Sequence, residues 1–231
     1  DLVIAGGAET KLVPLCMIRQ ELLGRVCTTG NESAATACRP FDASASGTVI
    51  GEGGGLLILE DLERAVARGA KIYAEIVGAG AACDPAGMHV TEPTVGGLDR
   101  AARSALRDAN LSPDAVGLLV AHGTGVPAED RLEAAAWQTA LGNRAENIPA
   151  WSVTGAVGST FAGAGAIELI GAALALANQT APATVNFQKP IDGCRLKFLR
   201  QSRPCQADYA LSGAHTVGGQ SAAVVLKRYQ P

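Results

Sequence analysis

A histidine-containing segment, His122-Gly123-Thr124, has the residue types and the position in which chemistry is expected. The apolar run at 116–121 predicts a buried strand that ends directly before it, and Asp130 and Glu133 follow at the start of the next predicted helix. The carboxyl end of a parallel strand is where sites of α/β proteins usually lie. Gly123 lets a ligand approach the backbone, and the two acids can hold the loop by hydrogen bonds near the helix N-terminus. From chemistry alone, a functional and a purely structural His122 are both open.

The sequence lacks the motifs of several other kinds of functional site. The glycine clusters at 51–55 and 163–165 suggest phosphate loops, but the first precedes a predicted strand and the second lies within helical sequence. A dinucleotide fingerprint needs its glycines between a strand and a helix, so we interpret both clusters as tight turns and close packing. The sequence has neither a G-x-S-x-G elbow nor a G-x-x-x-x-G-K-[ST] loop. These patterns argue against nucleotide binding and against serine hydrolase chemistry.

Cysteines and histidines are scattered without the spacing of metal ligands. We therefore expect no metal and no cofactor. Isolated thiols in a chain of this size predict reduced, buried cysteines in a cytoplasmic protein. The residues concerned are Cys16, Cys27, Cys38, Cys83, Cys194, Cys205, His89, His122 and His215.

The composition predicts a folded domain with an unusually small-residue core. The chain has 231 residues, of which 48% are hydrophobic and only 18% charged, which excludes disorder. A net charge of −3 gives no positive field to hold a polyanion, so nucleic acid is not expected as a partner. With 28 glycines and 4% aromatic residues, close backbone packing is expected where elements meet. Because the chain begins at Asp1 in strand-like sequence without a methionine, we expect another segment to precede it, in the gene or in a partner.

The elements that must position the histidine alternate along the chain. Strands are predicted at 2–5, 56–59, 72–77, 116–121, 151–153, 209–213 and 222–227, the first of them buried, and helices at 61–68, 98–109 and 130–141. The segment 160–178 is long enough for a membrane span, but its alanine and glycine content favours a helix buried on all sides, and no membrane is expected. Alternating strands and helices predict one α/β layered domain with a substantially parallel sheet.

An ordered set of short motifs gives a family resemblance that covers essentially the whole chain. The motifs are Arg39-Pro40-Phe41-Asp42, Gly51-Glu52-Gly53, Leu59-Glu60, Ala67-Arg68-Gly69-Ala70, His122-Gly123-Thr124 with Asp130 and Glu133, Gly158, Ala164-Gly165-Ala166-Ile167-Glu168, Thr184-Val185-Asn186 and Gly218-Gly219. In this order they resemble the β-ketoacyl synthases of the thiolase fold. The resemblance implies a layered α/β/α fold corresponding to the C-terminal half of a condensing enzyme: one domain over 1–231, with 1–10 as the last strand of the first half.

The departures from the family pattern are as informative as the matches. The family mechanism uses a cysteine nucleophile, two histidines and a lysine. The resemblance places Ser159 where the second histidine belongs and Thr154 where the lysine belongs, and it leaves His122 as a retained relic whose loop is supported by Thr124, Asp130 and Glu133. Cys38 is not expected to be the nucleophile, because the Arg-Pro-Phe-Asp motif that follows it identifies a later segment. In the gating loop the Gly-Phe-Gly-Gly pattern is replaced by Thr216, Val217, Gly218 and Gly219, preceded by His215.

A site that keeps its scaffold and loses its charged groups is typical of one branch of the family. The resemblance is strongest to chain length factors, inactive subunits that form a heterodimer with an active ketosynthase, shape the polyketide tunnel and meet an acyl carrier protein transiently. Such a subunit is expected in the cytoplasm and expected to present a large apolar interface. Two alternatives remain open. One is half of an active β-ketoacyl synthase, an acyltransferase whose cysteine lies in a missing N-terminal part. The other is a decarboxylase or acyl-binding protein that uses His122 alone.

Overall fold

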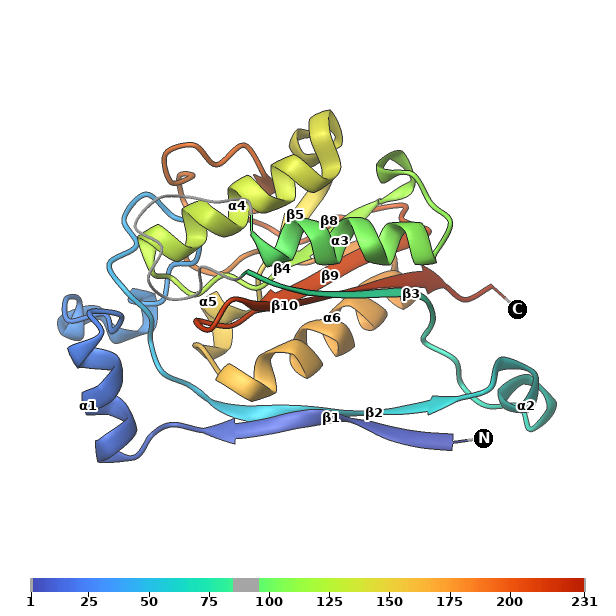
Figure 1. Cartoon of the computed structure of the whole chain (residues 1–231), viewed down its shortest axis with the longest axis horizontal. Helices are drawn as coiled ribbons and strands as arrows, with labels where there is room; N and C mark the ends of the chain where they lie inside the picture. Colours follow the sequence, from blue (N-terminus) through green and yellow to red (C-terminus); the bar gives the residue numbers. More distant parts are fainter. Residues whose placement is uncertain (1, 85–95, 231) are drawn as a thin grey trace.

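The computed structural model describes residues 2–84 and 96–230 and arranges them in layers (Figure 1). Its helices and strands follow in this order: β1 (Leu2–Thr10), α1 (Pro14–Leu22), β2 (Glu52–Glu60), α2 (Leu62–Ala67), β3 (Ala74–Cys83), α3 (Gly97–Asp108), β4 (Leu118–Ala121), α4 (Pro127–Leu141), β5 (Pro149–Trp151), α5 (Thr154–Val157), α6 (Ala164–Asn178), β6 (Thr180–Ala181), β7 (Lys197–Phe198), β8 (Arg203–Pro204), β9 (Tyr209–His215) and β10 (Gln220–Arg228). Single 3₁₀ turns lie at Asn31–Thr36, Pro113–Ala115, Gly142–Glu146 and Phe161–Gly163. His89 lies outside the described residues.

The central sheet has six strands in the order β3-β10-β9-β4-β5-β7. The pairs β9–β4, β4–β5 and β5–β7 are parallel, whereas β10 runs antiparallel to both β3 and β9. The predicted α/β fold is therefore confirmed, but the sheet is mixed rather than substantially parallel. The parallel strand β4 lies among parallel neighbours and is buried along its whole length, and its carboxyl end delivers the chain to His122.

Helices α3 and α4 cover one face of this sheet and α6 covers the other (Figure 1). Helix α3 follows the prediction closely, with its apolar stripe buried and Arg100, Arg103 and Arg107 on the outer side. It packs tightly on β3 because Gly78 and Gly80 have no side chain: a Cβ atom there would lie 2.3 and 2.2 Å from carbonyl oxygens of the helix. The glycines thus replace large side chains in joining helix and sheet, as the composition predicted.

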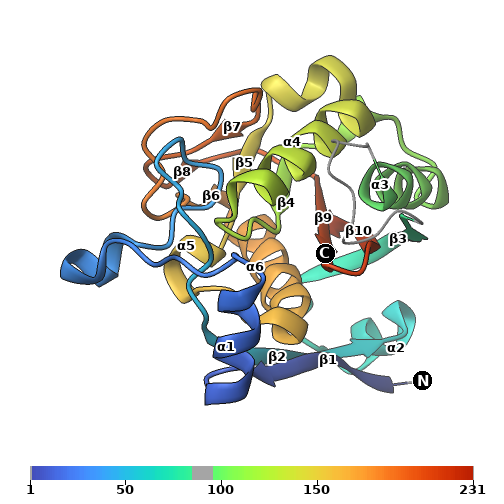
Figure 2. The ribbon, with the colours of Figure 1, turned by 60° about the vertical axis from the view of Figure 1, so that its left-hand side comes forward.

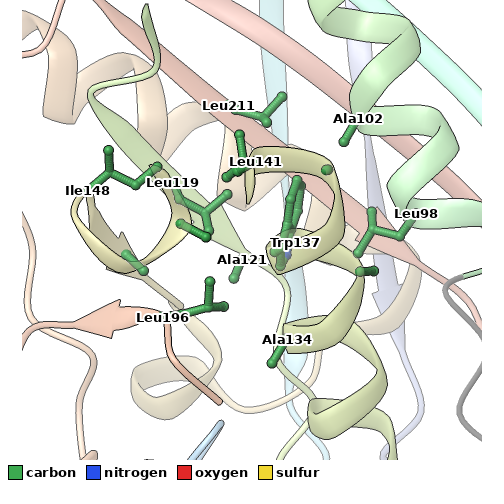
Figure 3. Packing of buried hydrophobic residues seen from close by; sticks show 14 of the residues in the cluster. Leu98, Ala102, Leu119, Ala121, Ala134, Trp137, Leu141, Ile148, Leu196 and Leu211 are labelled. Atoms are coloured by element: carbon green, nitrogen blue, oxygen red, sulfur yellow. The ribbon is translucent and has the colours of Figure 1, made fainter. Parts of the chain in front are cut away.

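Two apolar clusters lie on the two faces of the central sheet. Under α3 and α4, the fully buried Trp137 fills the middle of the larger cluster, beside Leu98, Leu119 and Leu211 (Figure 3). On the opposite face, alanines of α6 and Leu176 pack against Leu118 and Val120 of β4 and against Trp151. Alternate residues of β4 thus point into the two clusters. This packing on both faces fixes the position at which the strand ends and the His122 loop begins.

Helix α6 is shorter and less enclosed than the sequence predicted. It starts at Ala164, after a 3₁₀ turn at Phe161–Gly163, and Leu174 is 43% exposed, so it is not buried on all sides. The stretch Phe161–Asn178 is long and apolar enough to cross a membrane by length and composition, with 39% of it buried inside the structure. Its only charged residue, Glu168, is fully buried and lies in contact with His122. A buried charge with a partner inside the protein is typical of the core helix of a globular protein.

Beyond α6 lies a separate two-stranded sheet, here called the outer sheet, formed by β1 and β2 in antiparallel register from Leu2↔Glu60 to Thr10↔Glu52 (Figure 1). Its inner face, including Ala5 and Leu57, packs toward α6 around a small cavity. The prediction of a buried first strand was wrong, because Leu2, Val3 and Ile4 are 52 to 64% exposed. An apolar run is buried only where a second layer covers it, and among the described residues α6 covers one face alone.

The segment that connects β1 to β2 is also poorly covered. Helix α1 has no buried residue, and it stands beside one end of the outer sheet with Met17, Ile18 and Leu22 about half or more exposed (Figure 2). Apolar exposure is therefore concentrated in the first quarter of the chain rather than spread evenly. Large contiguous apolar surfaces of this kind mark sites of interaction with another chain or segment.

Candidate functional site

His122 stands at the carboxyl end of β4, as predicted, and its side chain is 8% exposed. The next residue, Gly123, has a φ of +63°, and a Cβ atom there would lie 2.7 to 2.8 Å from Phe41, Pro40 and Ser152. Only glycine satisfies both the left-handed backbone and the close approach. The loop therefore turns sharply and holds the imidazole at one fixed position beneath the 40–41 segment.

Glu133 from α4 accepts four hydrogen bonds, and two of them come from the backbone of this turn. Its Oε1 accepts from the backbone N–H of His122 at 2.7 Å and from Trp137 Nε1 at 3.0 Å. Its Oε2 accepts from the backbone N–H of Gly123 at 2.8 Å and from His215 Nε2 at 3.3 Å. Burial would raise the pKa of Glu133, but the hydrogen bonds from His215 and Trp137 and the positive charge of His122 lower it. Glu133 is thus an ionised carboxylate whose acceptor sites are filled by fixed donors.

Asp130 holds the next part of the loop one helical turn earlier. Its Oδ1 accepts from the backbone N–H groups of Thr124 at 2.8 Å and Gly125 at 3.2 Å, and its Oδ2 accepts from the N–H of Phe41 at 2.7 Å. Complete burial and the neighbouring Glu133 charge outweigh these bonds and raise the pKa of Asp130 to about 7. The predicted loop-supporting set of Thr124, Asp130 and Glu133 is therefore brought together around His122.

Glu168 of α6 binds the imidazole itself. His122 Nδ1 lies 2.6 Å from Glu168 Oε1, and both side chains are buried. Burial opposes a charged imidazole, but Glu168, together with Glu133 and Asp130, raises the pKa of His122 to about 9. At neutral pH the ring is therefore an imidazolium, which presents N–H donors and is not a free base. The second oxygen, Glu168 Oε2, has no hydrogen-bond partner among the described residues.

The two positions where the resemblance implies lost charges differ in their relation to His122. Thr154, at the start of α5, donates its hydroxyl to the His122 carbonyl oxygen at 2.9 Å, and Ser152 donates to the same oxygen at 2.7 Å. Ser159 is buried, and its backbone bonds to Val49 and Gly51 rather than to the histidine. Neither side chain carries a charge to the site.

The gating-loop residues close one side of the site. His215, the last residue of β9, lies with its ring 5.2 Å from that of His122 in an edge-on arrangement. Val217 and Gly219 belong to the turn between β9 and β10, which also includes Gly218. His215, Val217 and Gly219 line a cavity of about 440 Å³, and Glu133 reaches the same cavity from α4. His122 lies behind His215, outside the cavity lining.

Cysteines do not supply a nucleophile to this histidine. Cys38 is buried, burial raises the pKa of its thiol to about 11, and its Sγ–H donates to the Thr154 carbonyl. All six cysteines are free thiols. Within residues 2–84 and 96–230, no group of three or more His, Cys, Asp or Glu side chains is arranged to hold a metal ion. The arrangement thus offers an imidazolium, a second imidazole that lines the cavity, and three carboxyl groups, Glu133, Asp130 and Glu168, of which Glu133 reaches the cavity.

Sequence reasoning missed three parts of the site: the Glu168 ion pair, Ser152 as a second donor to the His122 carbonyl, and Trp137 as a donor to Glu133. One of them left a readable signal. Glu168 is the only charge in the apolar segment 160–178, and a single buried charge requires a partner of opposite sign. The other two depend on where β5 and α4 lie in space, which spacing along the chain does not reveal.

Comparison with protein families divides the chain between two profiles of one family. Residues 73–188 match the beta-ketoacyl synthase C-terminal domain, and residues 1–65 match the beta-ketoacyl synthase N-terminal domain. The match to the N-terminal domain extends well past the boundary at residue 10 that the resemblance implied. The outer sheet and α1 therefore fall on one side of the family's domain boundary and the central sheet on the other.

Curated relatives give the same grouping. The chain is 40% identical over 231 residues to 3-oxoacyl-[acyl-carrier-protein] synthase 2 of Synechocystis sp., a match that covers 99% of this chain and 55% of the relative. It is 38% identical to a putative polyketide beta-ketoacyl synthase 1 of Streptomyces cyaneus, covering 98% of this chain and 54% of the relative. The chain thus spans about half the length of the curated relatives it matches.

Solved structures superpose closely on the whole chain. A type II polyketide synthase acyl-carrier protein in complex with its ketosynthase bound to the hexaketide (AntDE:AntF) matches with a TM-score of 0.95 at 32% identity, over 100% of this chain and 57% of that one. The ishigamide ketosynthase/chain length factor matches with a TM-score of 0.89 at 29% identity, over 100% of this chain and 54% of that one. The layers described above are thus those of a thiolase-like ketosynthase fold.

Proposed function

Because the chain belongs to the β-ketoacyl synthase family, we propose that it is a chain length factor, a subunit that does not catalyse condensation and pairs with an active ketosynthase. In this role it lines the tunnel that receives the growing acyl chain in type II polyketide or fatty-acid-like biosynthesis. An acyl carrier protein delivers that chain transiently, and the pair works in the cytoplasm. No cofactor is required.

The observation that carries this proposal is the uncharged pair Thr154 and Ser159. Condensation develops negative charge on an enolate and on an oxyanion, and preorganised charged donors are the main means of stabilising such charge. The Thr154 hydroxyl is already used on a backbone carbonyl, and Ser159 makes no hydrogen bond to His122 within the described part of the chain. His122 alone among these positions keeps its charge, and the buried Cys38 thiol, whose pKa is raised to about 11, is not ionised.

The surface of the chain supports a partner. The outer sheet presents Leu2, Ile4, Leu56 and Ile58 on one face, each more than half exposed, and α1 continues the apolar surface. Among the similar structures, the ishigamide ketosynthase/chain length factor pairs these two kinds of protein by name, and AntDE:AntF holds a ketosynthase with an acyl-carrier protein. An apolar surface of this kind fits a stable heterodimer better than a transient contact.

A second candidate function is half of an active β-ketoacyl synthase, an acyltransferase completed by an N-terminal part that carries the cysteine. Its support is that the His122 loop is intact, with Asp130, Glu133 and Glu168 all in contact with it, and that relatives bear enzyme names. Loss of a single preorganised stabiliser costs on the order of 100- to 1,000-fold in rate. The absence of charge at two positions therefore favours the first candidate.

Pairing is tested by co-expressing the chain with the ketosynthase encoded beside it and analysing the size of the purified species. We expect a stable one-to-one complex and, for the chain expressed alone, aggregation at high concentration driven by the exposed apolar face. A soluble monomer that ignores the ketosynthase would contradict the proposed pairing. Treatment of the chain with a cysteine-directed condensing-enzyme inhibitor then separates the candidates, because covalent labelling of this polypeptide supports the second one.

Tunnel shaping is tested by enlarging one side chain that faces the cavity. Val217→Trp in the complex is expected to shorten the products, because the indole occupies space beside His215. Val66→Trp is the matched control, since Val66 lies exposed on α2 and does not line this cavity. Product lengths that stay the same in Val217→Trp would remove the length-setting role.

A further inference from the structure

His215 and Glu133 form a carboxylate–imidazole pair that the proposed function does not use. His215 Nε2 lies 3.3 Å from Glu133 Oε2, and the His215 side chain is 18% exposed whereas Glu133 is buried. Both line the 440 Å³ cavity between α4 and the turn after β9. A buried carboxylate that holds an imidazole at the surface of a cavity is the orienting half of an acid–base site.

The protonation of this imidazole follows from its partner. Glu133 is ionised, and a carboxylate only accepts hydrogen bonds. The proton of neutral His215 therefore sits on Nε2, and Nδ1 carries the lone pair. Nδ1 makes no hydrogen bond to any described residue, so it is free to accept a proton from a molecule in the cavity. The gating loop thus presents a base in a fixed tautomer.

The charged groups that face His215 come from four elements or the segments that follow them. His122 follows β4, Glu129 lies on α4, and Arg25 and Asp84 reach the cavity from the segments after α1 and β3. Arg25 is held by Glu129 in a two-pronged ion pair at 2.6 and 2.7 Å, so its charge is largely compensated. The positive charge nearest to the base is therefore that of His122.

His122 complements the base as an anion stabiliser. Its Nδ1 is fixed by Glu168, so the remaining Nε2–H of the imidazolium is unpaired among the described residues. The two ring centroids are 5.2 Å apart, so the positive charge of His122 lies close to the base although His122 itself does not line the cavity. A positive charge placed where an oxyanion develops lowers the barrier for attack on a carbonyl.

We propose that His215, oriented by Glu133, acts as a general base that hydrolyses an acyl thioester bound in this cavity. The inference rests on the proposed function only for the class of substrate, an acyl chain carried as a thioester. Hydrolysis needs neither a cysteine nor the groups missing at Thr154 and Ser159, because water is the nucleophile. The site would release chains that stall in the tunnel.

The step is balanced with water as the only co-reactant. His215 Nδ1 takes one proton from water while the oxygen bonds to the carbonyl carbon, and the resulting oxyanion is stabilised by the positive charge of the nearby His122 imidazolium. Collapse of this intermediate breaks the carbon–sulfur bond, and the proton on His215 passes to the leaving thiolate. The products are a carboxylic acid and a free thiol, and His215 returns to its neutral form.

The test measures thiol release from a hexanoyl N-acetylcysteamine thioester by the complex of this chain with its ketosynthase. We expect hydrolysis above the buffer rate and a loss of about 100-fold or more of that excess in His215→Gln, the usual contribution of a general base. The wild-type rate should fall above about pH 9, where His122 loses its proton. A merely structural His215 would be replaced by His215→Gln, whose amide can still donate to Glu133, whereas a general base is lost in both His215→Gln and His215→Phe.

Controls separate this inference from the proposed function. Asp114→Asn, at an exposed position in the 3₁₀ turn before β4, carries any contaminating thioesterase through the same purification and should keep the wild-type rate. Size analysis reports pairing in every variant. Intact pairing with no hydrolysis above buffer, or with an unchanged rate in both His215 variants, overturns the inference and leaves the proposed function standing. Hydrolysis above the buffer rate in a sample that shows no pairing supports the inference and contradicts the proposed function.

Discussion

The loop after β4 and the outer sheet are both built on short apolar strands, yet one is complete within the chain and the other is not. Every residue of β4 is buried, and the loop that follows has its backbone N–H groups bonded to Glu133 and Asp130. In β1, by contrast, no residue is buried: Leu2, Val3 and Ile4 are all exposed, and from Ala5 onward half-covered residues alternate with exposed ones. The geometry of the site is thus set by this chain alone, whereas the outer sheet is stabilised only when something covers its second face.

The contrast has a physical origin in the number of layers that each strand meets. β4 has α3 and α4 on one side and α6 on the other, so both faces bury apolar area, each buried side chain contributing about 1.5 to 3 kcal/mol. Among the described residues, the outer sheet packs on one face only, against α6 and the 3₁₀ turn that precedes it. A site enclosed in this way tolerates few changes, whereas the outer sheet tolerates many in the isolated chain and few in a complex. The predictions below test that difference.

Glu133→Gln is expected to have the largest effect. The amide replaces one carboxylate oxygen by an NH₂ group, which then faces either His122 N–H and Trp137 Nε1–H or Gly123 N–H and His215 Nε2. Leaving buried donors unsatisfied costs about 1 to 3 kcal/mol each, so the free energy of unfolding should fall by roughly 3 to 5 kcal/mol in urea titration.

The matched control for this change is Glu146→Gln. Glu146 pairs with Arg195 at the surface, where both side chains are largely exposed. Such pairs contribute about 0 to 1 kcal/mol, so the control should stay close to wild type. If the two variants lost the same stability, the loop after β4 would not be the enclosed unit that its hydrogen bonds indicate.

The next largest effect is the pH dependence that His122 imposes on stability. Its pKa is raised from 6.5 to about 9 in the folded chain, so protonation favours the folded state. This contribution is complete below pH 6.5 and is lost as the pH rises through 9, which amounts to about 2 kcal/mol between pH 7.5 and 9.5. Asp130, whose pKa is raised to about 7, changes stability mainly below this window.

Urea titrations at pH 7.5 and 9.5 measure the difference. Wild type should be less stable at the higher pH, and His122→Gln should lose the part of this dependence that His122 contributes, while the buried thiols of Cys38 and Cys194, whose pKa values are raised to about 11, keep a remaining slope. An equal slope in both proteins would mean that Glu168 and Glu133 do not hold the imidazolium. The outer sheet has no buried titrating group, and changes there should leave the slope unaltered.

The sequence predicted the enclosed region better than the open one, for a physical reason. The position of His122 followed from the apolar run at 116–121 and from acids at the start of a helix, which are local patterns. The His122–Glu168 pair joins residues 46 positions apart, and spacing does not report such contacts. The burial of β1 was mispredicted because an apolar run shows that a strand prefers to be covered, and the covering layer lies elsewhere. His215 was placed in the gating loop, but only the fold brings its ring edge-on to His122.

Thr154→Val removes one of two donors to the His122 carbonyl and should have a smaller effect. Valine keeps the shape of threonine, and Ser152 still donates to the same oxygen at 2.7 Å. The loss of one hydrogen bond predicts a decrease of about 1 kcal/mol in the free energy of unfolding. Thr154→Ser keeps the hydroxyl and serves as the control. Adding Ser152→Ala to Thr154→Val leaves the carbonyl without a side-chain donor and should cost more than the sum of the two single changes.

Substitutions on the open face of the outer sheet are expected to change the stability of the chain least. Leu56→Ser and Ile58→Ser lie on exposed side chains, at 71% and 67% exposure, so the free energy of unfolding should change by less than about 0.5 kcal/mol. Leu119→Ser, on the same kind of strand segment but fully buried in β4, should cost several kcal/mol because it leaves a cavity and buries a hydroxyl. The two serines should nevertheless reduce aggregation of the chain alone and weaken its complex with the ketosynthase, both read by size analysis. If they destabilised the isolated chain as much as Leu119→Ser does, the outer sheet would be covered within the chain itself, and its apolar face would no longer support a partner.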